Sequence, residues 1–378
     1  MKNSKAAQII LLVCRLLFGF TFIFSGFVKA VDPLGTAYKV NDYLVAFGME
    51  DLAFLSLACA FILITVEFCI GFCMTLGIFL KQTSWVAALF MLVMTPLTLY
   101  LAIADPVSDC GCFGDAVVLT NWQTFYKNVI LDIILVAILI CMRTYRPWLQ
   151  PVPSFVAVGI GVIAGMGLQI HCYRHLPIID FRPYKVGNNI AELMTIPEGM
   201  PADRYDISFI YEKDGVQKEF TLENYPADDS TWVFVEQKSV LVEKGYEPPI
   251  HDFSLTLPEM GDVTDLVLEN PGYTFLLIST KLEDCDTGHL DEINSIHSFA
   301  RDNGIAFYGM TASTDDVIET FKAEHDLEFP IATSDETMLK TVIRSNPGLV
   351  LLKNATVTGK WHYNDLPSPK EIESIIKQ

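Results

Sequence analysis

The chain has 378 residues, of which 51% are hydrophobic and 19% charged, and its formal net charge is -19. Soluble domains usually have about a quarter of their residues charged, and nucleic-acid phosphates attract lysine and arginine, so the composition argues against both an ordinary soluble protein and a nucleic-acid partner. The long apolar runs lie in residues 1–170 and most acidic residues follow them, which indicates two environments.

Five apolar segments are long enough to cross a bilayer, which takes about 20 residues in a helix. They cover residues 9–28, 52–80, 85–104, 125–142 and 155–170. The first could be a secretory signal peptide, because Lys2 and Lys5 precede it. However, this run is long, contains Arg15 and has no convincing small-residue cleavage site, so we interpret it as an uncleaved span.

The basic residues predict the orientation of these spans, because cytoplasmic segments carry an excess of lysine and arginine. With the N-terminus inside, the inner segments hold Lys2, Lys5, Lys81, Arg143 and Arg146. The outer segments hold Lys29 and Lys39, and residues 105–123 hold neither residue type. We therefore expect a bacterial inner-membrane protein with a cytoplasmic N-terminus. Its 105–123 loop and its acidic tail would share the periplasm, an oxidising compartment.

Four charged residues lie within or at the end of the apolar runs: Arg15, Lys29, Glu67 and Asp132. Such charges are costly in a bilayer and usually face a partner or a cavity. From their depths we expect two pairs, Arg15 with Glu67 and Lys29 with Asp132. The pairs would be either structural contacts between helices, with a lysine that reaches the interface, or a polar pocket for a quinone or for protons.

The sequence DCGCFGD at 109–115 places Cys110 and Cys112 one glycine apart in the outer loop. A disulfide between them would close a very small ring, in which the preferred dihedral angle and Cα spacing are hard to satisfy. A strained, exposed disulfide exchanges readily with thiols, and Gly111 relaxes the backbone limits. The pattern favours a transient, redox-active disulfide.

Other roles for these cysteines stay open. Each could bond a distant cysteine, and Cys172 at the outer end of the fifth span is the obvious candidate. Metal binding is less favoured, because the usual spacing is C-x2-C and no histidine lies nearby. His171, Cys172 and His175 could themselves bind a metal, although an interfacial cap on the span is favoured. The other cysteines in spans are interpreted as small hydrophobic residues, namely Cys14, Cys59, Cys69, Cys73 and Cys141.

Four stretches of the membrane half carry a family resemblance: RLLFGFTFIFSGFVKAVDPLG (15–35), VEFCIGFCMTLG (66–77), CGCFGD (110–115) and KNVILDIILV (127–136). They make residues 8–145 similar to the DoxX / methylamine utilisation MauE family of membrane proteins. The resemblance implies a four-helix bundle, so that the fifth span is an addition. MauE is implicated in maturing a disulfide-rich periplasmic enzyme beside a separate thioredoxin-like partner, and DoxX relatives are linked to quinone-coupled sulfur oxidation. The matching positions are Arg15, Lys29, Glu67, Cys110, Cys112 and Asp132.

Residues 171–248 are predicted to be a connector with some structure of its own. Residues 205–222 alternate around Asp214-Gly215, a strong signal for a β-hairpin. Residues 230–245 are predicted to form two more short strands. We expect a small antiparallel unit that docks the tail to the membrane.

From about residue 249 to 378 the chain alternates predicted strands and helices. Strands are expected at 273–280 and 304–312, helices at 290–303, 314–326 and 369–377, and a hairpin at 348–361. A Thr residue and two acidic residues open the second helix, as is typical of helix N-termini. This order predicts an α/β domain with a mixed sheet.

Three stretches of this domain, HDFSLT (251–256), ISTKLEDCDTGHLDEI (278–293) and RSNPGLVLL (344–352), resemble the thioredoxin superfamily in its peroxiredoxin or TlpA-like branch. The resemblance implies an active-site cysteine at Cys285 and a cis-proline at Pro347. The family pattern is C-x-x-C, and here Gly288 replaces the second cysteine.

The acidic residues around Cys285 disfavour a thiolate; they are Glu283, Asp284 and Asp286. A lone cysteine can attack a disulfide but cannot release the mixed disulfide. Cys110 and Cys112 could supply the missing thiol from the membrane loop.

Two functions follow from these patterns. The first is a membrane thiol–disulfide oxidoreductase, in which Cys110 and Cys112 relay electrons between a membrane acceptor and Cys285 or a disulfide-containing periplasmic client. The second is a non-enzymatic envelope assembly or binding protein, whose degenerate thioredoxin-like domain only holds a partner. A subunit of a quinone-linked sulfur oxidation system ranks third. We favour the first, with quinone as a candidate cofactor and no metal.

Overall fold

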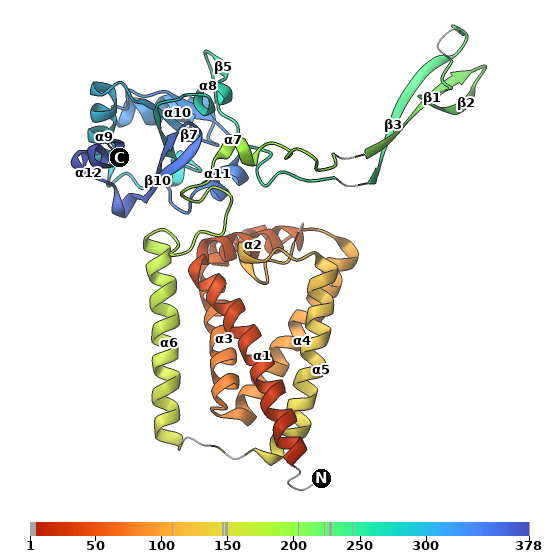
Figure 1. Ribbon diagram of the computed structural model, residues 1–378, viewed down its shortest axis with the longest axis vertical. Coiled ribbons are helices and arrows are strands. Elements are labelled where there is room, and N and C mark those ends of the chain that lie inside the picture. The colour runs from red at the N-terminus through yellow and green to blue at the C-terminus, as the bar shows by residue number, and fades with distance from the viewer. Residues whose placement is uncertain are drawn as a thin grey trace.

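The computed structural model describes residues 5–107, 109–145, 147, 150–202, 204–222, 224–226, 229–243 and 245–377. Lys2 and Arg146, which entered the orientation argument, lie outside these residues. Figure 1 shows a bundle of long helices, an α/β domain above one end of it, and a small sheet that extends to one side.

The bundle contains five helices that are long and apolar enough to span a membrane. They are α1 (Lys5–Val31), α3 (Ser56–Leu76, preceded by a 3-10 turn at Glu50–Leu55), α4 (Leu80–Ala104), α5 (Asn121–Cys141) and α6 (Pro151–Arg174). The five predicted spans are therefore confirmed as helices. Helices α1, α3, α4 and α5 form a four-helix group, and α6 lies at its side against α3 and α1 (Figure 1).

Glycines bring α1 and α3 into backbone contact. A Cβ atom on Gly26 would lie 2.9 Å from the amide nitrogen of Phe68, and one on Gly71 would lie 2.5 Å from that of Ile23. Small residues at such contacts let membrane helices approach closely. The contact sets the relative height of the two helices, with Gly26 level with Phe68.

A short helix that the sequence analysis did not expect, α2 (Pro33–Ala46), lies across the end of the bundle that faces the α/β domain (Figure 1). The Asp32 side chain caps it by accepting a hydrogen bond of 2.9 Å from the Gly35 amide. Pro33 occupies the first helical turn, where its missing N–H group costs nothing. Helix α2 therefore forms the surface on which the second half of the protein rests.

The α/β domain is built on a seven-stranded sheet with the order β10-β9-β6-β7-β8-β4-β5. The strands are β4 (Thr256–Leu257), β5 (Gly261–Asp262), β6 (Tyr273–Ile278), β7 (Ala306–Thr311), β8 (Ile331–Thr333), β9 (Gly348–Lys353) and β10 (Thr356–His362). Strands β6, β7 and β8 are parallel, and β9 and β10 are antiparallel to their neighbours. A βαβ unit followed by a ββα unit makes this a thioredoxin-like fold.

Helices cover both faces of this sheet because β6 alternates its apolar side chains. Phe275 and Leu277 pack with α9 (Leu290–Asp302), α10 (Asp315–Glu324) and α12 (Pro369–Ile376). Leu276 and Ile278 pack with α8 (Thr264–Leu268) and α11 (Glu336–Val342). The expected strands, helices and hairpin are confirmed. The sequence analysis missed β8 and α11, which are short.

The segment expected to be a connector divides into two parts. Residues 176–194 belong to the α/β domain, because Tyr184 and Ile190 are 1% exposed in its core and α7 (Ile190–Leu193) packs on it. The other part is a separate sheet of β1 (Arg204–Lys213), β2 (Val216–Thr221) and β3 (Val233–Glu243) with the order β2-β1-β3.

This small sheet confirms one prediction and corrects two. Asp214 and Gly215 both have positive φ values, 53° and 77°, and form the expected hairpin turn. The two short strands predicted for 230–245 were wrong, because β3 is one strand of 11 residues that pairs along β1. The sheet also does not dock on the membrane half: it projects away from the α/β domain (Figure 1).

Candidate functional site

The two cysteines of the CGC loop face each other. Their sulfur atoms lie 2.7 Å apart, and the residues are 7% and 8% exposed. Gly111 makes this possible with a φ of 64°, a left-handed conformation that glycine adopts without strain. Two hydroxyl groups hold the loop, since Tyr43 donates to the Cys110 carbonyl at 2.6 Å and Ser25 donates to the Cys112 carbonyl at 2.7 Å.

Cys172, the alternative disulfide partner in the sequence analysis, is a free thiol buried on α6. Cys110 and Cys112 form a small cluster with each other and with apolar residues of α2 and α4. The structure thus brings these two thiols together and places Cys172 on another element.

The charges around the pair make its two thiols unequal. The hydrogen bond between the two sulfur atoms lowers the pKa of Cys112 to about 6, with help from the positive charges of Lys127 and Lys29 and against the effect of burial. The same hydrogen bond, together with burial, raises the pKa of Cys110 well above its usual value. This asymmetry favours the thiolate on Cys112 and the neutral thiol on Cys110.

Beneath the loop, Lys29 and Glu67 form a buried ion pair. The ammonium donates to both carboxylate oxygens, at 2.8 and 2.9 Å, and both side chains are less than 8% exposed. Ser25 bridges this pair to the loop by lying 3.3 Å from the Glu67 carboxylate.

Both predicted intramembrane pairs were wrong. The glycine contact sets Gly26 level with Phe68, so Lys29, one turn further along α1, reaches Glu67. Arg15 lies on α1 about three turns before Gly26. Its guanidinium is 5.1 Å from the centre of the Tyr145 ring. Asp132 instead accepts a hydrogen bond from Thr95 at 2.8 Å.

A small cavity of about 20 Å³ lies beside Cys112 and is lined by Ser25, Glu67, Lys127 and Asn128, among others. That volume suits a single water molecule with polar partners. It does not fit the ring of a quinone, so we derive no step through a quinone at this position.

Cys285 lies in the loop between β6 and α9, just after a 3-10 turn at Leu282–Asp284. Burial raises the pKa of its thiol to about 11, and the negative charge of Asp286 adds to the effect. The Asp286 amide donates to the Asn346 carbonyl at 3.1 Å, and the Asn346–Pro347 peptide bond is cis. Cys285 therefore sits beside the loop in which the sequence analysis placed a cis-proline.

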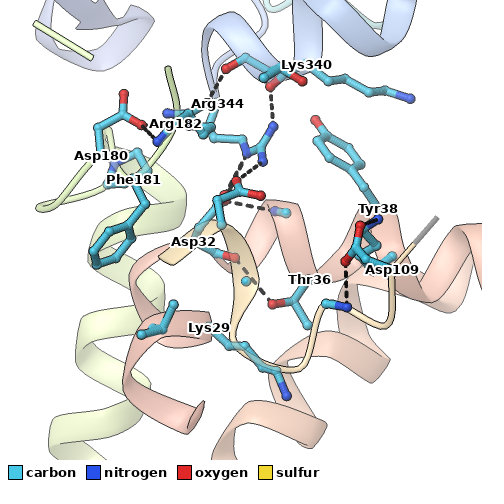
Figure 2. A pocket seen from close by; sticks show the side chains of 18 of the residues that line it. Lys29, Asp32, Thr36, Tyr38, Asp109, Asp180, Phe181, Arg182, Lys340 and Arg344 are labelled. Atoms are coloured by element: carbon cyan, nitrogen blue, oxygen red, sulfur yellow. Dashed lines mark hydrogen bonds and ion pairs between the residues drawn. The ribbon is translucent and has the colours of Figure 1, made fainter. Parts of the chain in front are cut away.

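The same loop contacts the membrane half through Arg344, which is 6% exposed. Its guanidinium bonds both carboxylate oxygens of Asp32 at 2.9 and 3.0 Å and reaches Asp115 of the CGC loop at 3.4 Å (Figure 2). Burial alone would raise the pKa of Asp32, but Arg344 and Arg182 hold that pKa below its usual value. The guanidinium also lies 5.3 Å from the centre of the Tyr38 ring of α2.

A polar cavity of about 240 Å³ separates the two halves around this contact. Figure 2 shows side chains of α2, the CGC loop, the segment after α6 and α11 converging on it. Its lining includes Asp32, Asp109, Arg182, Lys340 and Arg344.

The sequence analysis named none of the contacts between the halves, nor Lys127. Two local signals were available. Asp32-Pro33 is a pattern typical of helix starts. Arg344 lies three residues before Pro347, which the sequence analysis had expected to be a cis-proline.

At the C-terminal end of α6, the rings of His171 and His175 are in contact, with their centres 4.8 Å apart. His175 pairs with Asp365 of the α/β domain at 2.8 Å, so this end of the span contacts the domain directly. Within the ranges that the structure describes, no group of three or more His, Cys, Asp or Glu residues could hold a metal ion.

Comparison with protein families identifies two regions. Residues 7–143 match the family of methylamine utilisation protein MauE, and residues 205–244 match a domain of unknown function, DUF8463. The second match coincides with the projecting sheet β1–β3. Among curated proteins, no sequence matches the chain.

Solved structures resemble the C-terminal part. They include a secreted disulfide oxidoreductase of Mycobacterium tuberculosis homologous to E. coli DsbE (17% identity, 33% of this chain and 95% of that one, TM-score 0.27). StoA from Bacillus subtilis (16%, 32% and 94%, TM-score 0.27) and a thiol:disulfide interchange protein of the thioredoxin family from Chlorobium tepidum (13%, 33% and 91%, TM-score 0.26) are also similar. The fold assignment above rests on strand order and helix placement.

Proposed function

We propose that this chain, a MauE-family membrane region followed by a thioredoxin-like domain, is a membrane-bound thiol–disulfide oxidoreductase. Cys110 and Cys112 are its redox-active pair, and Cys285 forms the mixed disulfide with the client protein. The observation that supports this best is the Arg344 contact. It joins the loop beside Cys285 to Asp115, three residues after Cys112, so that the two thiol sites belong to one assembly.

The exchange balances without a further oxidant. Cys285 and a client disulfide give a Cys285–client mixed disulfide and one client thiol. The Cys112 thiolate attacks the Cys285 sulfur, which forms a Cys112–Cys285 disulfide and releases the second client thiol. Cys110 then attacks the Cys112 sulfur, closes the Cys110–Cys112 disulfide and frees Cys285. Two electrons and two protons pass from the loop to the client, and the reverse sequence oxidises a client.

The charge asymmetry of the loop supports this division of labour. A thiolate attacks disulfides and a thiol does not, and the pKa of about 6 makes Cys112 a thiolate at neutral pH. Cys285, with a pKa raised to about 11, would attack slowly by itself and gains a fast partner in Cys112. The orientation that suits the chemistry has the N-terminus in the bacterial cytoplasm and both thiol sites in the periplasm.

Thiol trapping in intact membranes tests the proposal. We expect the Cys110→Ser variant to accumulate a Cys112–Cys285 disulfide, detected as a cross-linked peptide by mass spectrometry after maleimide blocking. Resolution by Cys110 is the step that this variant lacks. The double variant Cys110→Ser/Cys285→Ser should lack the cross-link, and Cys110→Ser/Cys69→Ser should retain it. If Cys110 and Cys112 stay in one redox state in the wild type and no cross-link forms, the relay is wrong.

A second function is favoured by two observations. The raised pKa of Cys285 and the glycine at position 288 suit a binding platform without thiol chemistry. In that case Cys285→Ser would keep full function in the cell, whereas substitutions on the outer surface of the domain would abolish it.

A further inference from the structure

The chemistry proposed above needs one of two adjacent thiols to be the attacking group, and the hydrogen bond between them does not decide which. With sulfur atoms 2.7 Å apart, either one can donate to the other. The choice is made by the charges and cavities around each sulfur.

Cys110 lies in apolar surroundings. Leu101 is buried with it, and Leu97, Val107 and the ring of Tyr43 pack on the same cluster. Such a site favours the neutral thiol.

Cys112 belongs to the same apolar cluster, but it also lines the small polar cavity beside the bundle interior. The same cavity is lined by Glu67 and Lys127, which come from α3 and α5. Two lysines thus lie near this sulfur, and their situations differ.

Lys29 is neutralised, because both oxygens of Glu67 accept from its ammonium. Lys127 is not. Across the part of the chain that the structure describes, no salt bridge includes Lys127, and its ammonium lies 4.6 Å from the centre of the Phe113 ring. A cation over an aromatic face keeps its charge and is held in place. Phe113 directly follows Cys112, so the ring holds the ammonium at the CGC loop.

We infer that Lys127 is a positioning residue that makes Cys112, rather than Cys110, the attacking thiol of the loop. Its uncompensated charge faces the cavity that Cys112 lines, and a thiolate on Cys112 is the anion that completes the pair. Cys110 then keeps its proton until the mixed disulfide on Cys112 has formed. This inference rests on the proposed function for its biological meaning, but the charge effect can be measured without any client.

The titratable groups that face Cys112 are Cys110 on its own loop, Lys29 on α1, Tyr43 on α2, Glu67 on α3 and Lys127 on α5. The negative charge of Glu67 destabilises a thiolate on Cys112, and the positive charge of Lys29 offsets that effect. Removing the charge of Lys127 therefore leaves the hydrogen bond from Cys110 as the main support of the thiolate. Because the pKa of Cys112 is lowered, its thiolate persists down to about pH 6 in the wild type, and the variant should lose it at a higher pH.

The experiment uses the full-length protein, reduced and in detergent, and measures the iodoacetamide alkylation rate of each cysteine by isotope-coded mass spectrometry between pH 5 and about 10. We expect Lys127→Met to raise the midpoint for Cys112 by about one pH unit and to slow its alkylation about threefold at pH 6.5 and nearly tenfold at about pH 5. Lys127→Arg should restore the wild-type profile. Lys39→Met, which removes the lysine paired with Asp109, is the matched control and should leave the midpoint unchanged.

An unchanged midpoint in Lys127→Met would overturn the inference, as would equal effects of Lys127→Met and Lys39→Met. Correct folding is checked by the Cys285 profile, which should be the same in all variants. Failure of the relay would instead appear as a missing Cys112–Cys285 cross-link with a normal Cys112 midpoint, so the two ideas fail separately.

Discussion

We expect the Glu67→Gln variant to lose about 3–5 kcal/mol of stability, because it leaves the Lys29 ammonium buried without its counter-ion. The side chains of both partners are buried, 5% and 7% exposed, on helices that are in backbone contact at Gly26 and Gly71. Lys29→Met should destabilise the protein by a similar amount. The loss is measured as a lower midpoint of unfolding when SDS is titrated into the detergent-solubilised protein.

The double variant Lys29→Met/Glu67→Leu provides the internal comparison. It removes both charges together, so it should be far more stable than the sum of the single losses predicts. Glu328→Gln is the matched surface control, because the pair of Glu328 with Arg301 is 70% and 57% exposed and should contribute less than about 1 kcal/mol. A Glu67→Gln variant as stable as Glu328→Gln would show that the ion pair does not hold the bundle.

The second large effect is expected at the contact between the two halves. Arg344→Gln removes the partner of two carboxylates, Asp32 and Asp115, at a buried site. A loss of about 3 kcal/mol would shift the ratio of docked to undocked domain about 100-fold, since 1.4 kcal/mol is about tenfold. The yield of the Cys112–Cys285 cross-link in a Cys110→Ser background should fall accordingly.

Proteolysis provides a second measurement of the loss of docking in this variant. In Arg344→Gln, added trypsin should cut faster at Lys340, which lines the cavity between the halves and lies 4.9 Å from the centre of the Tyr38 ring of α2 when they are docked. Arg301→Gln, at an exposed position of the same domain, should change neither the cross-link yield nor the cleavage rate. Wild-type cleavage and cross-linking in Arg344→Gln would mean that the domain docks by other contacts.

Much of the fold could be predicted from local patterns. Apolar runs of sufficient length locate the five membrane helices, and alternation with turn residues locates the β1–β2 hairpin and most of the thioredoxin-like domain. Helix α2 was missed because it is short and half polar, so no hydropathy signal marks it. The strand β8 has three residues and depends on its neighbours in the sheet rather than on its own sequence.

The candidate site was harder to predict, because it depends on contacts distant in sequence. The CGC motif identified Cys110 and Cys112, but depth alone gave the wrong partner for Glu67. The correct partner depends on how far α1 has slid along α3, which the glycine contacts determine. Arg344 and Asp32 are 312 residues apart, and nothing local to either one indicates the other.

The junction after α6 affects how the protein would turn over. Helix α6 ends at Arg174, and Leu176 already packs against the core of the thioredoxin-like domain. A domain on a flexible linker samples many positions, so the rate at which it meets its partner site depends on the length of the linker. Here a short junction and ion pairs hold the two thiol sites in one assembly, so their exchange would be a first-order event whose rate does not depend on protein concentration.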